Sequence, residues 1–447
     1  MSERISRRQF CGKAGQGATA LGVAASSAFA WLPARAEPAE GRKRRMHNDK
    51  ITLGVIGCGG MGPVNMYTLM GKPEVEIAAL CDVDAAHLHP HAANIAKKYG
   101  KKPALYTDFR KLLERKDIQA VIISTPDHWH ALPVIYACEA GKDIYCEKPV
   151  SHDITEALAM DAAVRKFGRI VQVGTWQRSR PEFVSALAYV RSGKLGKVTT
   201  VRAWKTDEAQ VGRDQITLPP SSLDYNLWVG PAAFEPYKPN HVHANWRWFL
   251  NYGSGMTGDW GVHMIDIGLL GLSSGPDLVM PVEVASLGGK LAYPADERTA
   301  PDTMVSILKF KNPDFVLQWE TGRDHPGRPY HGTEFVGADG RSVMVWRGGW
   351  VVRDREGREL PREEAPGVND HWQNWLDCIR SRTQPRANLS SVAQSTIVCH
   401  LANAALLAGE TVRWDKAKND IVGRAGKNTQ SYYREYRKPW SLPIHKV

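Results

Sequence analysis

The hydrophobic positions between residues 50 and 175 fall into short apolar runs separated by longer amphipathic stretches. The runs cover residues 51–56, 75–81, 120–124, 143–146 and 170–174, and helical spacing is clearest at 85–99 and 154–167. Strands separated by helices of this length are typical of a parallel, doubly wound α/β sheet. Because such sheets bind ligands beyond the carboxyl ends of their strands, the residues that follow each run are the first functional candidates.

The pattern changes from about residue 176. A strand is expected at 198–204, and a long irregular stretch rich in Pro, Asn and Trp follows over 208–255. Alternating segments at 284–290, 303–310, 316–320, 331–336 and 342–346 then predict a large open, mainly antiparallel sheet, followed by helices at 371–381 and 391–409. We therefore predict a Rossmann domain over 50–175, an α+β domain over 176–425 for substrate binding and oligomerisation, and a carboxyl-terminal tail over 426–447.

The first residues carry an export signal. Ser6-Arg7-Arg8-Gln9-Phe10 is a twin-arginine sequence, a weakly apolar Ala/Gly-rich stretch follows, and an A-x-A pattern ends at Ala36. This arrangement predicts a signal peptide over 1–36 and a linker over 37–49, with the Tat export machinery as a partner and a periplasmic location. The apolar stretch is too short and too rich in Gly to be a stable membrane anchor. Tat export carries proteins that have already folded in the cytoplasm.

Charge and cysteine content bear on two further classes of ligand, nucleic acids and metals. The net charge is +11, yet no nucleic-acid-binding motif accompanies it, so we expect no nucleic-acid partner. The seven cysteines form no C-x-x-C pair and show no zinc-ligand spacing, so we expect no metal.

The run at 51–56 leads into a glycine-rich loop of the form G-x-G-x-x-G, made by Gly57, Gly59 and Gly62, with Met61 inside it. These glycines allow a tight turn, a close approach of the backbone to a pyrophosphate, and close packing of helix on strand. Asp82 ends the next run, where an acid can accept from both hydroxyls of an adenosine ribose and repel a 2′-phosphate. The loop therefore predicts a dinucleotide site that favours NAD over NADP.

Two further strand ends carry candidate chemistry. Thr125, Pro126 and His130 follow one run, and Glu147 and Lys148 follow the next. A lysine at a strand end beside a nicotinamide can donate or accept a proton. Spacing alone leaves open whether Lys148 is such a group or a surface lysine in a loop.

These motifs resemble those of the Gfo/Idh/MocA family of glucose–fructose oxidoreductase and inositol dehydrogenase. The similarity rests on the glycine loop, on Thr-Pro-x-x-x-His, on Glu-Lys-Pro, and on the later run Gly258-Asp259-Trp260-Gly261-Val262-His263-Met264-Ile265-Asp266. The resemblance implies that Lys148 is catalytic, that Asp259 and His263 complete the site, and that Pro126, His130 and Glu147 line the nicotinamide end. It also implies a homodimer or homotetramer formed through the open face of the second sheet.

The residues themselves support a role for Asp259 and His263. Positions four apart on a helix share a face, so Asp259 is expected to orient His263, which titrates near neutral pH. The alternative is a capping Asp beside a buried structural His.

The substrate side is expected to include Trp176, Gln177, Arg178 and Trp246, because indole faces suit sugar rings and polar groups suit their hydroxyls. We expect an NAD(P)-dependent oxidoreductase that removes hydride from a hydroxyl-bearing carbon of a sugar or polyol, with Lys148 or His263 as the base. Because the periplasm supplies little NAD, a tightly held and internally recycled cofactor is expected. The alternatives are an NAD-dependent glycosidase, epimerase or lyase that uses transient oxidation, and a non-catalytic sugar-binding protein.

Overall fold

The computed structural model describes residues 50–206, 210–323, 327–365 and 370–443. The chain divides into two units, Met1–Glu37 and Pro38–Val447, and every described residue belongs to the second. The expected signal peptide and linker lie outside the described residues, so both stay predictions.

The first domain contains a six-stranded sheet in the order β3-β2-β1-β4-β5-β6, and all its neighbouring strands are parallel. Its strands are β1 (Ile51–Ile56), β2 (Val75–Cys81), β3 (Ala104–Tyr106), β4 (Ala120–Ile123), β5 (Asp143–Cys146) and β6 (Val171–Val173). The strand order reverses direction between β1 and β4, the position at which doubly wound sheets bind ligands. The predicted parallel sheet is confirmed.

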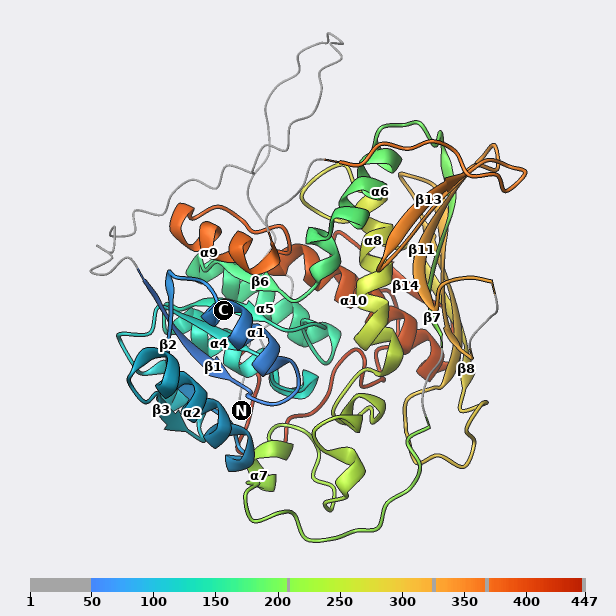
Figure 1. Ribbon diagram of the computed structural model, residues 1–447. Coiled ribbons are helices and arrows are strands. Elements are labelled where there is room, and N and C mark those ends of the chain that lie inside the picture. The colour runs from blue at the N-terminus through green and yellow to red at the C-terminus, as the bar shows by residue number, and fades with distance from the viewer. Residues whose placement is uncertain (1–49, 207–209, 324–326, 366–369, 444–447) are drawn as a thin grey trace, which may run out of the picture. The chain divides into compact units, whose positions relative to one another are not determined.

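Helices connect these strands and cover the sheet (Figure 1). They are α1 (Met61–Met70), α2 (Ala85–Tyr99), α3 (Phe109–Leu113), α4 (Ala131–Glu139) and α5 (Ile154–Phe167). Local sequence sets several of their ends: Asp84 accepts from the Ala86 N–H at the start of α2, and Gly100 ends that helix with a left-handed φ of 68°. The strand residues of β4 and β5 are buried without interruption, as covering on both faces requires.

The second domain contains a nine-stranded sheet in the order β13-β12-β11-β7-β10-β9-β8-β14-β15. Its strands are β7 (Val198–Thr206), β8 (Glu283–Gly289), β9 (Thr303–Phe310), β10 (Phe315–Gly322), β11 (His331–Gly337), β12 (Ser342–Trp346), β13 (Gly349–Arg353), β14 (Val412–Asp415) and β15 (Asp420–Ile421). The mainly antiparallel sheet that the sequence predicted is confirmed, with one parallel pair, β7 and β10.

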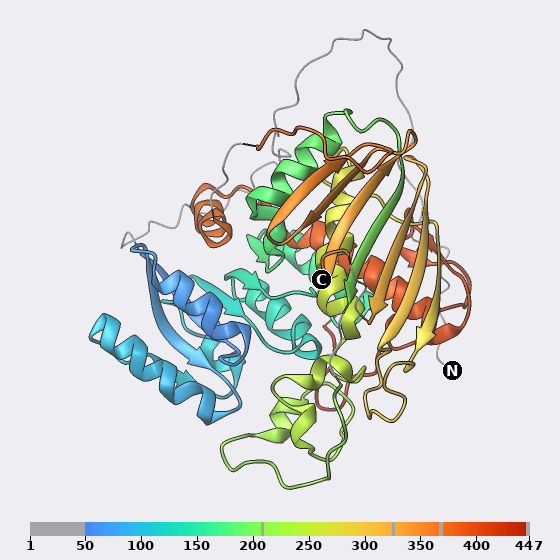
Figure 2. The ribbon, with the colours of Figure 1, turned by 45° about the vertical axis from the view of Figure 1, so that its right-hand side comes forward.

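Helices cover one face of this sheet, as Figure 2 shows. They are α6 (Pro181–Arg191), α8 (Val262–Leu272) and α10 (Leu389–Ala408). In β9, buried and exposed positions alternate, and Val305 and Ile307 are 43% and 45% exposed. The face opposite the helices is therefore open and partly apolar.

The last two long helices differ in what they contact. The side chains of Trp375 and Leu376 in α9 (His371–Ser381) belong to the apolar cluster of the first domain, together with Ile51 and Leu53. Helix α10 contacts both α5 and β8. Within the described chain α10 is also long and apolar enough to cross a membrane, but 78% of its most apolar window is buried inside the protein, as in a core helix.

Two segments without long helices or strands lie beside the first domain. Residues 210–255, here called the covering segment, contain only α7 (Tyr225–Val229) and short 3₁₀ turns. Their backbone joins the loop after β2: the Ala85 N–H donates to the Ser222 carbonyl at 2.9 Å, and the Asp224 N–H to the Val83 carbonyl at 2.9 Å. The described part of the expected tail is also packed, because Trp440 lies edge-on against Trp129 at 4.8 Å between ring centres.

Candidate functional site

The glycine loop has the shape that the sequence predicted. A Cβ on Gly57, whose φ is +88°, would lie 2.7 Å from the Ser124 backbone, and one on Gly62 would lie 2.2 Å from the Gly57 carbonyl oxygen. Helix α1 begins at Met61, within this loop, without a side-chain cap. The N–H groups at its start are therefore available to a negatively charged group, as a pyrophosphate site requires.

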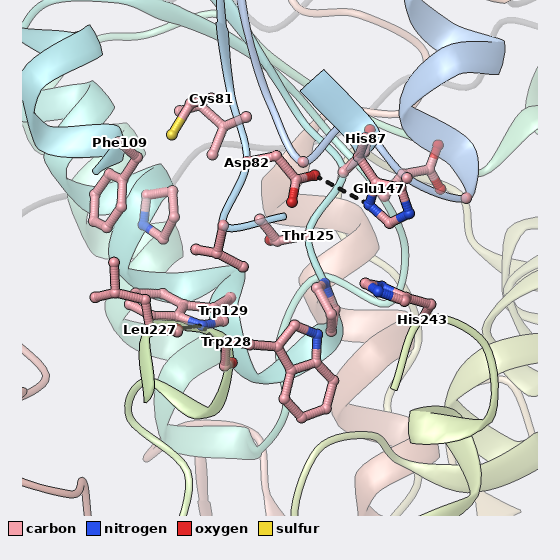
Figure 3. A pocket seen from close by; sticks show the side chains of 18 of the residues that line it. Cys81, Asp82, His87, Phe109, Thr125, Trp129, Glu147, Leu227, Trp228 and His243 are labelled. Atoms are coloured by element: carbon pink, nitrogen blue, oxygen red, sulfur yellow. Dashed lines mark hydrogen bonds and ion pairs between the residues drawn. The ribbon is translucent and has the colours of Figure 1, made fainter. Parts of the chain in front are cut away.

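Asp82 lies at the end of β2 and lines the cavity above the glycine loop. Its carboxylate accepts from the Cys58 N–H at 2.7 Å and from the Asp84 N–H at 2.9 Å. His87 Nδ1 lies 3.7 Å from the same carboxylate, and this interaction with Asp82 raises the pKa of His87 (Figure 3). The backbone therefore holds Asp82 at the place where an adenosine ribose is expected.

The cavity is lined from both domains. Strand ends supply Asp82, Thr125 and Glu147, and the facing wall includes Trp129 and Trp228 (Figure 3). The Thr125 hydroxyl is buried and has no hydrogen-bond partner in the described chain, so it is available to a ligand. Together with the uncapped helix and the glycine cradle, this orphaned hydroxyl shows that the cavity fits a dinucleotide.

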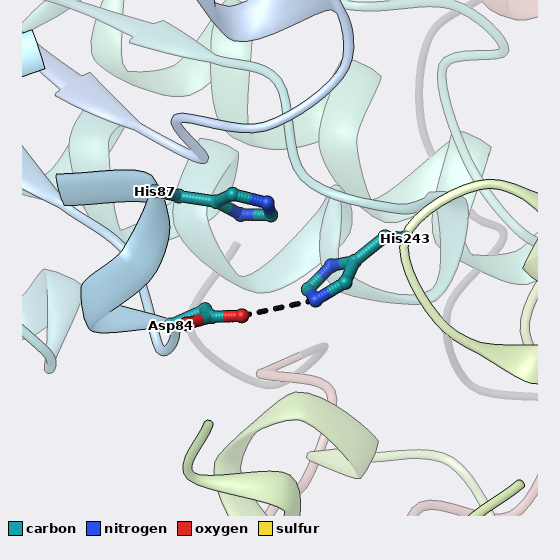
Figure 4. Close-up of side chains that lie close together, drawn as sticks. All are labelled: Asp84, His87 and His243. Carbon is teal, nitrogen blue, oxygen red and sulfur yellow. Dashed lines mark hydrogen bonds and ion pairs between the residues drawn. The ribbon is translucent and has the colours of Figure 1, made fainter. Parts of the chain in front are cut away.

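A cluster of polar side chains links the covering segment to the first domain beside this cavity. His243 Nε2 lies 3.0 Å from Asp84 Oδ2, and the His87 and His243 rings meet edge-on at 4.4 Å between centres (Figure 4). The backbone of His243 has a φ of 64°, which is uncommon for a residue other than Gly. Ligand atoms of these three residues lie within 4.8 Å of one another, so the fold groups metal-ligand types that the sequence separates.

Glu147 and Lys148, at the end of β5, both line the cavity. Asn65 donates to Glu147 at 2.8 Å, and burial raises the pKa of the Glu147 carboxyl. A Cβ on residue 174 would lie 2.7 Å from that carboxylate, so Gly174 leaves the space that the carboxylate occupies.

Lys148 reaches across to the second domain. Its Nζ donates to Asp259 Oδ1 at 2.6 Å and to the Asp259 main-chain oxygen at 3.0 Å, while Arg247 Nε donates to the same Oδ1 at 3.2 Å. Burial alone would raise the pKa of Asp259, but Lys148 and Arg247 together hold it well below its usual range. Asp259 is thus a fixed anion that positions two cations at the cavity.

The expected pairing of Asp259 with His263 is not what the fold provides. The hydrogen bonds of the Asp259 carboxylate run to Lys148 and Arg247. Residues Thr257–Gly261 form a π-helical turn before α8, and its wider spacing removes the alignment of positions four apart that an α-helix would give.

His263 is instead hydrogen-bonded to Gln177. With the amide oriented so that both of its ends are satisfied, the Gln177 nitrogen donates to His263 Nδ1 at 2.8 Å, and its oxygen accepts from Arg347 Nε and Nη2 at 3.2 Å each. Burial, followed by the charges of Lys148 and Arg347, lowers the pKa of His263 well below its usual value. His263 is therefore neutral near pH 7, with its proton on Nε2 because Nδ1 accepts.

Three expected site residues have other roles. Arg178 forms a buried bidentate ion pair with Asp266, at 2.8 and 2.5 Å, and also donates to Ser391, so it supports α8 and does not face a substrate. Both ring nitrogens of His130 lie within 2.8 Å of backbone carbonyls, those of Thr125 and Pro149. His130 therefore holds two cavity loops in place and does not itself line the cavity.

The third of these is Trp176, whose indole N–H donates to the Tyr145 hydroxyl at 3.2 Å and whose ring lies 5.3 Å from that of Trp372. It does not line the cavity, whereas Trp246 does. Pro126 and Met61 also line the cavity, as expected.

Arg347 is a site residue that the sequence does not reveal. It lies in the turn between β12 and β13, more than eighty positions after His263, and no motif surrounds it. Only the fold of the second sheet brings this turn next to Gln177.

Fold and site together define a protein with a Rossmann cofactor domain joined to an α+β domain. The family model for the NAD-binding Rossmann fold of Gfo/Idh/MocA oxidoreductases matches residues 51–175, and the model for their carboxyl-terminal α/β domain matches residues 190–287. The chain belongs to this family, and NAD is the cofactor that the family's first domain binds.

Relatives share different parts of the chain. Inositol 2-dehydrogenase of Rubrobacter xylanophilus is 30% identical over 162 residues, 36% of this chain and 45% of that one. Levoglucosan dehydrogenase of Pseudarthrobacter phenanthrenivorans is 26% identical over 313 residues, 66% of this chain and 73% of that one. The chain spans less than half the length of the inositol dehydrogenase and of several other curated relatives that it matches.

A solved structure agrees with the fold. The scyllo-inositol dehydrogenase of Lactobacillus casei, crystallised with NAD(H) and scyllo-inositol, superposes with a TM-score of 0.58 at 19% identity, covering 81% of this chain and 99% of that one. At this identity the likeness shows the shared two-domain fold.

Proposed function

We propose that the protein oxidises a hydroxyl group of a sugar or polyol by hydride transfer to NAD. The observation that carries this proposal is the Lys148–Asp259 pair, which joins the edge of the dinucleotide cavity to the second domain at 2.6 Å. Relatives named as inositol and levoglucosan dehydrogenases support a hydroxyl-bearing substrate. NAD would supply the hydride acceptor when bound.

The arrangement of His263 and Lys148 assigns them different tasks in this proposal. His263 carries its proton on Nε2 because Gln177 donates to Nδ1, so it acts as a hydrogen-bond donor to the substrate oxygen. Lys148 is then the group that takes the hydroxyl proton, once its ammonium has released a proton to solvent water. Asp259 and Arg247 hold the Lys148 amine in position.

The cofactor is retained between turnovers in this proposal. The covering segment supplies Trp228, His243 and Trp246 to the cavity wall, and Trp440 from the carboxyl-terminal part completes it. A nucleotide enclosed by these side chains leaves only when the covering segment moves. Retention suits a redox-neutral cycle in which a second sugar returns the cofactor to its starting state.

Export and assembly complete the proposal. The twin-arginine sequence around Arg7 and Arg8 directs the folded, NAD-loaded protein through the Tat pathway to the periplasm. The exposed apolar side chains of the second sheet, among them Leu287, Val305 and Ile307, support a homodimer or homotetramer formed through the open face.

The first test is made on protein exported through its own signal and purified without added cofactor. After denaturation, mass spectrometry is expected to find about one NAD(H) per chain, and the intact protein is expected to change absorbance at the NADH band when sugars or polyols are added. Protein that contains no nucleotide after this purification would contradict the proposal that the cofactor is retained. Nucleotide-loaded protein that binds sugars without any change in that band would contradict the oxidoreductase proposal and favour a binding protein.

A further inference from the structure

Arg347 has an unusual environment for a partly buried cation. Its guanidinium stacks on the Trp260 ring at 4.4 Å, and its Nε and Nη2 donate to the Gln177 oxygen. Among the described residues no carboxylate lies within ion-pair distance of it. Burial without an acidic partner lowers the pKa of Arg347 and disfavours its charge, so a bound anion would stabilise the site.

The surroundings of Arg347 are positively charged. Burial and the nearby charges of Arg347, Lys205 and Arg180 lower the pKa of His331 to about 4. The nearest acids are engaged elsewhere: Glu182 is paired with Arg180 at 2.7 Å, and Asp259 is shared by Lys148 and Arg247. The surroundings of Arg347 therefore attract an anion more strongly than a neutral group.

We infer that Arg347 binds the carboxylate of an acidic sugar, such as a uronic acid, whose hydroxyl is held at His263; this inference rests on the proposed function. The Nε–Nη2 edge of the guanidinium is occupied by Gln177, which leaves the Nη1–Nη2 edge for a planar carboxylate. The single positive charge of the guanidinium matches the single negative charge of one carboxylate. The Gln177 amide bonds to both Arg347 and His263, so we expect the hydroxyl and the carboxylate to belong to one molecule of monosaccharide size.

The test compares matched pairs that differ only at one carbon: D-glucuronate with D-glucose, and D-galacturonate with D-galactose. Binding to the NAD-loaded protein is measured by calorimetry, and NADH formation is followed in the same samples. We expect at least one uronate to bind about tenfold more tightly than its neutral partner, the factor of one charge-assisted hydrogen bond. Equal binding within both pairs, or no uronate binding at millimolar concentration, would overturn the inference.

Two variants test whether Arg347 causes the preference for uronates over neutral sugars. Arg347→Gln is expected to remove the difference within a pair, while Arg358→Gln, at an exposed arginine of the same domain, is expected to keep it. A loss of affinity that is equal for both members of a pair would count against the carboxylate site. If Arg347→Gln does not fold, salt decides the question in the wild type, since only uronate binding is expected to weaken with ionic strength.

The two proposals fail in different ways. Uronate binding that depends on Arg347 without NADH formation contradicts the proposed function and supports the carboxylate site. Oxidation of neutral sugars without a preference for the matching uronates supports the proposed function and contradicts the carboxylate site.

Discussion

The cofactor cavity and the polar cluster that Lys148 joins to it, here called the cofactor side and the substrate side, are built differently. The cofactor side comes from the glycine loop, Asp82 and Thr125, each at the carboxyl end of one of three adjacent parallel strands. The substrate side joins residues far apart in the chain: Lys148 and Asp259 are 111 positions apart, and Gln177 meets Arg347 across a still larger separation.

Because of this difference, the two sides should respond differently to amino-acid substitutions. Backbone shape defines the cofactor side, where two glycines leave no room for a Cβ. Charge and hydrogen bonding define the substrate side, where one amide links His263 to Arg347. Substitutions at the first side should therefore release nucleotide, and substitutions at the second should stop chemistry while nucleotide stays bound.

Lys148→Ala tests the substrate side most directly. We expect turnover to fall by about 10²–10⁴-fold, the usual contribution of a general acid–base group, while the nucleotide content per chain is unchanged. Steady-state rates and mass spectrometry of released nucleotide measure the two effects. Lys101→Ala, at an exposed lysine of the first domain, should change neither. Full turnover in the Lys148 variant would remove this residue from the mechanism.

Gly62→Ala tests the cofactor side. A Cβ there would lie 2.2 Å from the Gly57 carbonyl, so strand and helix must separate. We expect loss of bound nucleotide and a destabilisation of about 1–3 kcal/mol, typical of overpacking, measured by nucleotide content and chemical denaturation. The matched control is Gly275→Ala, where a Cβ meets nothing within 4 Å. Retained nucleotide would show that close helix–strand contact is dispensable.

His243→Ala tests the covering segment. It removes the 3.0 Å contact with Asp84 that links this segment to the loop after β2. We expect NAD to dissociate about three- to tenfold faster, as loss of one hydrogen bond predicts, which competition with a fluorescent analogue would measure. His89→Ala, at an exposed residue of α2, serves as the control. An unchanged rate would mean that the segment does not limit release.

Of these substitutions, Asp127→Asn is expected to have the smallest effect. It tests the junction of the two sides, where the Ser254 hydroxyl donates to the Asp127 carboxylate at 3.0 Å. Burial raises the pKa of Asp127 from 3.8 to about 7. The stability that the protonated carboxyl contributes is therefore complete below pH 3.8 and is lost as the pH rises to about 7.

Asparagine does not ionise, so the Tm of the variant minus that of the wild type should increase across this window and level off above it. Thermal melts at a series of pH values measure the difference. A difference that does not vary with pH would show that Asp127 is ionised throughout in the folded protein.

The sequence by itself determined the parallel sheet, the dinucleotide loop and the acid at the end of β2. These features follow from hydrophobic period and local turn chemistry, which act over a few residues, and they are present here as predicted. The same local reasoning placed Lys148 near the end of a buried strand as one candidate, and only the resemblance to the family implied that it is catalytic.

Only the tertiary structure decided which groups come together on the substrate side. Neighbouring positions after β6 have opposite roles: Gln177 meets His263, whereas Arg178 turns to the buried Asp266. A π-helical turn directs Asp259 to Lys148 and Arg247, and a distant hairpin supplies Arg347. Burial and charge pairing set these choices, and both depend on contacts between segments that the chain order does not reveal.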